Sequence, residues 1–193
     1  AFPTVPAMEL VEPDLRFLPA YVQALEDGWA FDDFWFGGPG AARLAAEQDP
    51  RALLDVLAGL AQPGHTVTLP DGRTVPRLPS IMRWMWDGGF AGSINVRWQD
   101  GTPDLPEYVL GHIGYGTVSS RQGRGYATEA LRGVLPIAWG AGLPYADLVT
   151  SVGNRASQVV IERNGGRVVE EFEHPSDPRG GRMLRWRIDR PVS

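Results

Sequence analysis

Residues 119–131 read SSRQGRGYATEAL, and the fold can be worked out from this stretch. Two glycines, Gly123 and Gly125, stand before a run with apolar residues at positions 127, 130, 131, 134, 135 and 138. That spacing predicts a helix. A helix N-terminus carries free N–H groups and a positive dipole, and glycine lets the backbone approach an anion closely. We therefore expect residues 122–128 to form an anion-binding loop, to which Arg121 and Arg124 add positive charge.

Other glycine-loop signatures fit this stretch poorly. A Walker loop requires four residues between its glycines and then Gly-Lys-Ser/Thr, a pattern that is absent here. A dinucleotide-binding fingerprint requires a third glycine where Thr128 stands, and an acidic residue after the next parallel strand. A tight turn that only caps the helix remains an alternative, as does another kind of nucleotide-phosphate binder.

The flanking sequence predicts a mixed order of strands and helices. Strands are expected over 8–13, 81–86, 90–98, 108–118, 141–152, 167–173 and 182–189. Helices are expected over 14–28, 41–61 and 154–166, besides the helix that follows the loop. Residues 62–80, with four prolines, predict a loop or a small hairpin.

Particular residues predict where these elements turn or end. The tripeptide DGG at 87–89 predicts a tight hairpin between two strands, and Asp14 is a candidate N-cap. A helix break is expected near Asp49-Pro50, and a kink or an early end at Pro136. Asn154 is expected near the start of the last helix.

This order indicates a mixed α/β (α+β) class, with a central, mostly antiparallel sheet flanked by helices. We find no internal repeat and no linker, so residues 1–193 are expected to form one domain. Residues 1–7 do not begin with methionine and are interpreted as a processed leader or as residues added for expression.

Composition excludes several kinds of site. The net charge of -5 argues against binding to nucleic acid by phosphate neutralisation, and weakly favours a cationic partner such as an amine. The absence of cysteine excludes disulfides, thiolate metal sites and a cysteine nucleophile. His65, His112 and His174 are too far apart in sequence for a local zinc motif, so no metal is expected. No apolar run is long enough for a membrane span, and no signal peptide is recognisable, so a cytoplasmic location is expected.

Three segments in the right order resemble the GNAT superfamily of N-acetyltransferases. Gln122-x-x-Gly125-x-Ala127 matches the Q/R-x-x-G-x-G/A signature of that superfamily. GHIGYGTVSSRQGRGYATEAL at 111–131 resembles its motif A, and NRASQVVIERNGG at 154–166 resembles its motif B. FAGSINVRW at 90–98 resembles the strand before motif A, so the resemblance covers roughly residues 80–170, the expected cofactor-binding core.

The resemblance implies a GNAT-like fold that binds acetyl-CoA as cosubstrate. Backbone groups of Thr117 and Val118 would pair with the pantetheine arm, and an asparagine, here Asn154, would help to hold it. The residues implied in cofactor binding are Thr117, Val118, Gln122, Gly123, Arg124, Gly125, Tyr126, Ala127, Thr128, Asn154 and Ser157.

The chemistry implied is direct attack of a neutral amine on the thioester, with backbone amides polarising the thioester carbonyl. The acceptor would be an amine-bearing small molecule or peptide, with no role for nucleic acid or membrane, and a homodimer is compatible with these features. The identity of the acceptor is not implied.

An amine with a pKa of about 10.4 must lose a proton before it attacks. His112 and Glu107 are candidate bases near the motif A strand, although His112 can equally be a packed residue bonded to a carbonyl, and Glu107 a solvated one. Asp32 and Asp33, among aromatic residues, are candidates to attract a cationic acceptor, with an ordinary exposed loop as the alternative.

Two positions depart from the pattern of the family. Ser119 stands where many members have proline, which leaves cofactor binding intact. Ile161 stands where many members have a tyrosine that protonates the departing thiolate, so Ser157 becomes the candidate acid. Because the sequence fixes neither the catalytic acid nor the catalytic base, a non-catalytic CoA-binding sensor or interaction module is the alternative function.

Overall fold

The hairpin expected around DGG forms the centre of the larger sheet. Strands β4 (Ser80–Trp86) and β5 (Phe90–Arg97) pair antiparallel across a turn in which Gly88 has a φ of 95°. Strand β1 (Glu9–Val11) extends the sheet beyond β4, and β6 (Ile113–Thr117) extends it beyond β5, giving the order β1-β4-β5-β6. This computed structural model describes residues 7–31, 40–58, 66–69, 71–174 and 181–192.

A second sheet is built from the C-terminal third of the chain. Strands β7 (Tyr145–Ser151), β8 (Arg167–His174) and β9 (Gly181–Asp189) pair antiparallel in the order β7-β9-β8. The small hairpin expected within 62–80 is present as β2 (Thr66–Thr68) and β3 (Thr74–Pro76). The mixed class with mostly antiparallel pairing is therefore confirmed.

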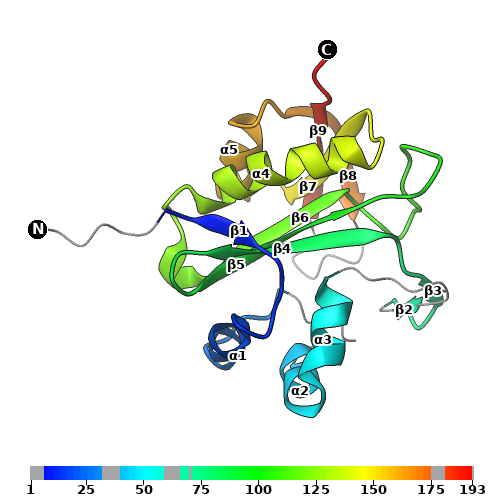
Figure 1. Ribbon diagram of the computed structural model, residues 1–193. Coiled ribbons are helices and arrows are strands. Elements are labelled where there is room, and N and C mark those ends of the chain that lie inside the picture. Colours follow the sequence, from blue (N-terminus) through cyan, green and yellow to red (C-terminus); the bar gives the residue numbers. More distant parts are fainter. Residues whose placement is uncertain (1–6, 32–39, 59–65, 70, 175–180, 193) are drawn as a thin grey trace, which may run out of the picture.

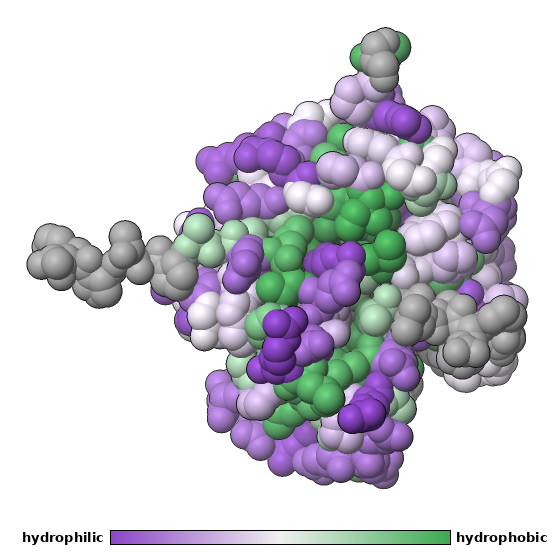
Figure 2. Space-filling model, viewed as in Figure 1, coloured by the Kyte–Doolittle hydropathy of each residue, from purple (hydrophilic) through white to green (hydrophobic). Residues whose placement is uncertain are grey.

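Helices cover both faces of the larger sheet. The helices α4 (Tyr126–Gly140) and α5 (Arg155–Glu162) lie on one side, and α1 (Leu18–Glu26), α2 (Ala41–Gln48) and α3 (Pro50–Leu57) lie on the other (Figure 1). On the face shown in Figure 2, hydrophilic residues cover the outer surfaces of these helical layers, and hydrophobic residues are visible in the band between them.

Two buried clusters correspond to these two layers. The first joins α4 to both sheets, and its members include Ile94, Val96, Leu131, Val134, Leu148 and Trp186. The second joins α1, α2 and α3 to the opposite face of β4 and β5. At its centre Tyr21 stacks on Trp84 with ring centroids 4.6 Å apart, and Phe90 packs edge-on against both rings. Burial of apolar side chains on both faces stabilises the larger sheet.

His112, just before β6, links the larger sheet to Asp147 of β7. The His112 backbone N–H donates to the Asp147 carbonyl (2.7 Å), and the Asp147 N–H donates to His112 Nδ1 (3.0 Å). The other ring nitrogen, Nε2, therefore carries the proton and donates to the Pro103 carbonyl (3.0 Å). Past this contact β6 pairs only with β5, and β7 only with β9. His112 is thus a buried joint between the sheets.

Several sequence expectations were wrong at element boundaries. The first helix begins at Leu18, because residues 14–17 form a turn in which Asp14 accepts from the Arg16 N–H (2.9 Å). Only 113–117 of the expected strand 108–118 is extended. A kink or an early end was expected at Pro136, and the early end is wrong, since α4 continues through Pro136 to Gly140. Proline removes one hydrogen bond, and the buried face of the helix outweighs that loss.

Other boundaries were confirmed. The break at Asp49-Pro50 separates α2 from α3, and the Asp49 carboxylate caps α3 by accepting from the Arg51 and Ala52 N–H groups (3.1 and 3.0 Å). Asn154 caps α5 as expected. Short polar side chains at these positions satisfy N–H groups that the helix itself leaves free.

Gly92 should be intolerant of any side chain. Its φ is 152°, and an added Cβ would lie 2.2 Å from the Gly116 carbonyl oxygen of β6. We expect Gly92→Ala to lower the free energy of unfolding by about 3 kcal/mol, measured by urea denaturation. Gly140→Ala, a helical position with nothing within 4 Å of the added Cβ, is the control and should be neutral or stabilising. A Gly92→Ala protein as stable as wild type would contradict this packing.

The His112 joint predicts a particular pH dependence of stability. Burial lowers the pKa of His112, and the nearby Asp147 only partly opposes this. Since the unfolded chain then binds the proton more readily, the joint contributes fully above pH of about 6.5 and is lost as pH falls through the lower folded-state pKa. The stability difference between wild type and His112→Gln should therefore shrink from pH 8 to pH 5. A constant difference would contradict a neutral His112.

Candidate functional site

The glycine-rich loop lies between β6 and α4. A single turn of 3-10 helix, Ser119–Arg121, is followed by Gly123 and Gly125, whose φ angles are 75° and 84°. An added Cβ would meet nothing within 4 Å at either glycine. Glycine is therefore required there by the left-handed backbone, and the space above the loop is open.

A cavity of about 770 Å³ lies beside this loop. One wall is formed by residues 115–117 of β6, and a second by residues 125–128 at the start of α4. Residues 154–157 at the start of α5 and the aromatic segment 28–31 complete it. The cavity therefore brings together both predicted cofactor-binding segments, which are far apart in the sequence.

The edge of β6 that faces away from β5 offers free backbone groups. The Arg97 N–H donates to the His112 carbonyl, and the Val118 N–H donates to the Ala91 carbonyl (3.0 Å). Because alternate residues of a strand point their N–H and C=O groups to opposite edges, Tyr115 and Thr117 direct theirs away from β5. The Thr117 carbonyl accepts from Gln122 Nε2 (3.4 Å), so at Thr117 the N–H is the group left for a ligand, whereas the N–H of Val118 is already bonded within the sheet.

The start of α5 closes the cavity opposite β6. Asn154 Oδ1 accepts from the Ser157 N–H (3.1 Å), so the motif B asparagine fixes the first turn of this helix. The Tyr115 hydroxyl crosses from β6 and donates to the Ser157 carbonyl (3.2 Å). Burial raises the pKa of Tyr115 to about 12, so its hydroxyl keeps its proton at neutral pH.

The aromatic end of the cavity rests on glycines of β6. An added Cβ at Gly116 would lie 3.0 Å from ring atoms of both Trp29 and Phe31, and one at Gly114 would lie 3.7 Å from Phe31. The two rings therefore lie against a strand surface that has no side chain on that face. Tyr115, Trp29 and Phe31 were missed from the sequence, although glycine at alternate positions in GYG is a signal of such close approach.

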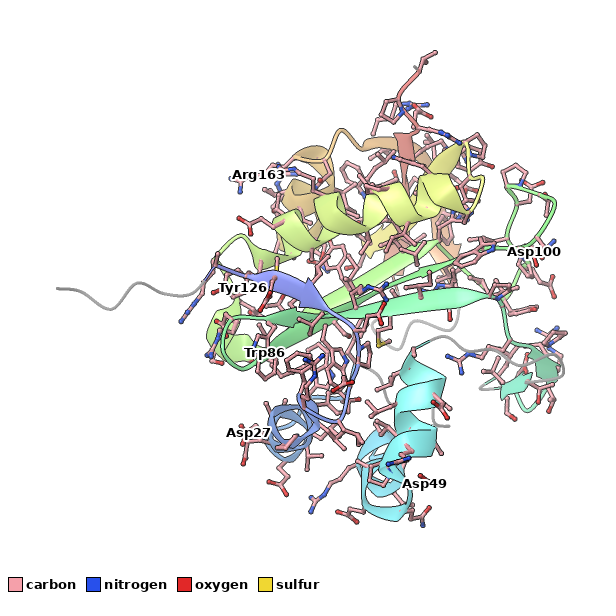
Figure 3. The ribbon with its side chains drawn as sticks, in the orientation of Figure 1. Asp27, Asp49, Trp86, Asp100, Tyr126 and Arg163 are labelled. Atoms are coloured by element: carbon pink, nitrogen blue, oxygen red, sulfur yellow. The ribbon has the colours of Figure 1, made fainter. Side chains whose placement is uncertain are left out.

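The arginines of the cavity differ in their partners. Arg121 pairs with Asp87 (2.7 Å), and Arg155 pairs with Glu162 (2.8 Å). Arg124 is exposed on the loop, and Arg163 lines the cavity from α5. Figure 3 labels Arg163 on the same side of the larger sheet as α4. Of the three arginines that line the cavity, Arg121 and Arg155 are thus each paired with a carboxylate, and Arg163 adds positive charge on the α5 side.

His112 and Glu107 lie elsewhere. They line a second cavity of about 600 Å³ that shares no lining residue with the first. Both ring nitrogens of His112 have backbone partners, so its neutral form has no lone pair left to accept a proton. The Glu107 side chain is 81% exposed and pairs with Arg73 (3.3 Å). The structure therefore does not bring these two candidates together with Ser157 and the loop.

The remaining expectations concern acidic residues, metals and membranes. Asp32 and Asp33 lie outside the described residues. Within the described ranges, no group of three or more His, Asp and Glu side chains could hold a metal ion. None of the helices described here combines the length and apolar character needed to cross a bilayer.

Solved structures share this fold. Mycobacterium smegmatis RimJ in complex with CoA-disulfide is 20% identical, with a TM-score of 0.66 over 96% of this chain and 83% of that one. RimL, a ribosomal L7/L12 alpha-N-protein acetyltransferase in complex with coenzyme A, is 16% identical, with a TM-score of 0.65 over 96% and 97%. The microcin C7 self immunity acetyltransferase MccE, in complex with acetyl-CoA and AMP, is 13% identical, with a TM-score of 0.61 over 95% and 92%.

Sequence comparison agrees with these structural neighbours. No curated protein matches the chain significantly. Residues 77–167 match the family described as Acetyltransferase (GNAT) domain, which spans β4 to α5 and includes the glycine-rich loop. Residues 77–167 are thus similar to a GNAT acetyltransferase domain, and the chain shares its fold with solved acetyltransferases.

Proposed function

We propose that the chain is an acetyl-CoA-dependent N-acetyltransferase that acetylates a primary amine by direct attack on the thioester. The observation that carries this proposal is the cavity in which the open glycine loop, the free edge of β6 and the start of α5 meet. Acetyl-CoA is an extended, anionic molecule with an amide-containing arm. A long cavity with backbone donors along one wall suits it.

The residues present fit the parts of this cosubstrate. The N–H groups of the loop and of the first turn of α4, residues 122–128, would hold the pyrophosphate, with Arg124 adding charge. The Thr117 N–H would pair with a pantetheine amide from the β6 side, its carbonyl being bonded to Gln122 Nε2, and Asn154 and Ser157 would bound the arm from α5. The Tyr115 N–H points from the same edge and would polarise the thioester carbonyl.

The reaction forms a bond between the amine nitrogen and the acetyl carbon, and breaks the bond between that carbon and sulfur. The amine loses one proton, and the thiolate of CoA gains one. No described carboxylate or imidazole lines the cavity, so we propose that water carries the proton away from the amine. The Tyr115 hydroxyl joins Ser157 as a candidate proton donor to the thiolate, because the two lie together on the cavity wall.

The acceptor is tested by turnover on a panel of amines. RimL is named for an alpha-amino group of a ribosomal protein, so the panel includes peptide N-termini beside small amines and polyamines. Release of thiol from acetyl-CoA with at least one amine supports the enzyme. Tight CoA binding without turnover on any amine supports the non-catalytic module instead. Thermal stabilisation by ATP or NAD but not by CoA would exclude both.

Gly125→Glu should abolish CoA binding. The substitution places bulk and negative charge where the pyrophosphate is expected, at a position with a φ of 84°. We expect the Kd for CoA, measured by calorimetry, to rise by about a hundredfold or more. Gly142→Glu is the matched control, because Gly142 has a similar φ of 88° at the far end of α4. Equal CoA affinity in the two variants would refute the placement of the pyrophosphate.

Tyr115→Phe and Ser157→Ala separate the two candidate proton donors. If the Tyr115 hydroxyl protonates the thiolate, Tyr115→Phe should lower kcat at least about tenfold, because only the transition state uses that proton. The Kd for CoA should stay within about twofold of wild type, since the backbone that binds the arm is unchanged. A kcat that falls only in Ser157→Ala would assign the role to Ser157.

A further inference from the structure

The turn between β4 and β5 carries a buried carboxylate that reaches the glycine-rich loop. Asp87 follows the last residue of β4, and its side chain is only 3% exposed. Figure 3 shows Trp86, its neighbour in the chain, at the same end of the molecule as Tyr126. Asp87 therefore projects from one hairpin toward a separate segment 34 or more residues later in the sequence.

Asp87 contacts both ends of the loop with one oxygen. Its Oδ2 accepts from Arg121 Nε (2.7 Å) and from the Tyr126 hydroxyl (3.0 Å). Arg121 is the residue before Gln122, and Tyr126 is the first residue of α4. Between these two anchors lie residues 122–125, which include both glycines with positive φ. A segment with two glycines has much backbone freedom, so fixed ends restrict it strongly.

The charge of Asp87 is unfavourable for the proposed ligand. Burial alone would raise the pKa of Asp87, but hydrogen bonds from Arg121 and Tyr126 outweigh it and lower the pKa below its usual value. The carboxylate is therefore ionised at neutral pH and lies beside the site proposed for a pyrophosphate. A negative charge there repels an anion and neutralises Arg121. A loop that attracted an anion by charge alone would bind it more tightly without the Asp87 carboxylate.

We infer that Asp87 is a positioning residue that holds Arg121 and Tyr126, and so keeps the loop in the conformation that binds the CoA pyrophosphate. This inference rests on the proposed function, since it takes CoA as the ligand of the loop. Two charge-assisted hydrogen bonds to a buried carboxylate give a defined geometry. Preorganisation of the loop amides then outweighs the repulsion between Asp87 and the phosphates.

Calorimetry with CoA distinguishes a positioning role of Asp87 from a purely electrostatic one. The two roles predict opposite changes in CoA affinity when the charge of Asp87 is removed. Asp87→Asn removes one negative charge, and by charge alone it would tighten CoA binding. If Asp87 positions the loop, the Kd for CoA should rise about tenfold instead. Tyr126→Phe removes one of the two anchors and should weaken CoA binding by a smaller factor. In the double variant that carries both Asp87→Asn and Tyr126→Phe, the Tyr126→Phe change should raise the Kd for CoA by a smaller factor than it does alone.

The matched control is Asp147→Asn. Asp147 forms the other buried aspartate–arginine pair, with Arg187 (2.8 and 2.9 Å), and lies outside the CoA cavity. This variant should lower thermal stability as Asp87→Asn does, but leave CoA affinity unchanged. In turnover assays Asp87→Asn should raise the KM for acetyl-CoA about tenfold, with the KM for the amine within about twofold of wild type.

A second readout does not depend on CoA. With its ends released, the loop should be cut faster by trypsin after Arg121 and Arg124 in Asp87→Asn than in Asp147→Asn, with cut sites assigned by mass. Unchanged or tighter CoA binding in Asp87→Asn overturns the inference while leaving the proposed function intact. Failure of the wild-type protein to bind CoA overturns the proposed function, and the inference with it.

Discussion

The site depends on a constraint at one strand edge. β6 is paired along its length with β5, and next to its start His112 is hydrogen-bonded to Asp147 of β7. Backbone N–H and C=O groups need partners, and an unpaired edge can accept another extended chain. The joint at His112 therefore does two things. It links the two sheets, and beyond it the N–H groups of Tyr115 and Thr117 lie on the strand edge proposed to bind the pantetheine arm.

The contacts of His112 favour one of the two roles that the sequence left open, that of a packed residue bonded to backbone groups. A histidine beside a predicted active-site strand has a suitable intrinsic pKa for a base. Its role depends on what its ring nitrogens contact, and here both contact backbone groups contributed by residues 103 and 147. Those partners come from a loop and from another sheet, so no local pattern could identify them.

The net charge of this protein does not show how its arginines are paired with carboxylates. Several arginines, among them Arg16, Arg43, Arg73 and Arg167, lie in ion pairs on the surface, where each pair contributes little to stability. The buried pairs Arg121–Asp87 and Arg187–Asp147 are different, because each joins separate elements and would leave a buried charge if broken. In the loop, therefore, the backbone amides and exposed Arg124 are the groups proposed to attract an anion, while Arg121 is paired with Asp87.

The sequence by itself determined the elements whose signals are local. The DGG hairpin, the break at Asp49-Pro50, the cap at Asn154 and the loop before α4 each depend on backbone preferences of a few neighbouring residues. Only the tertiary structure decided which segments meet. It separated His112 and Glu107 from the cavity, brought Tyr115 to Ser157, and joined Asp87 to the loop. Such contacts arise from packing between segments distant in sequence, so neither residue of a pair indicates the other until the sheets and helices are in place.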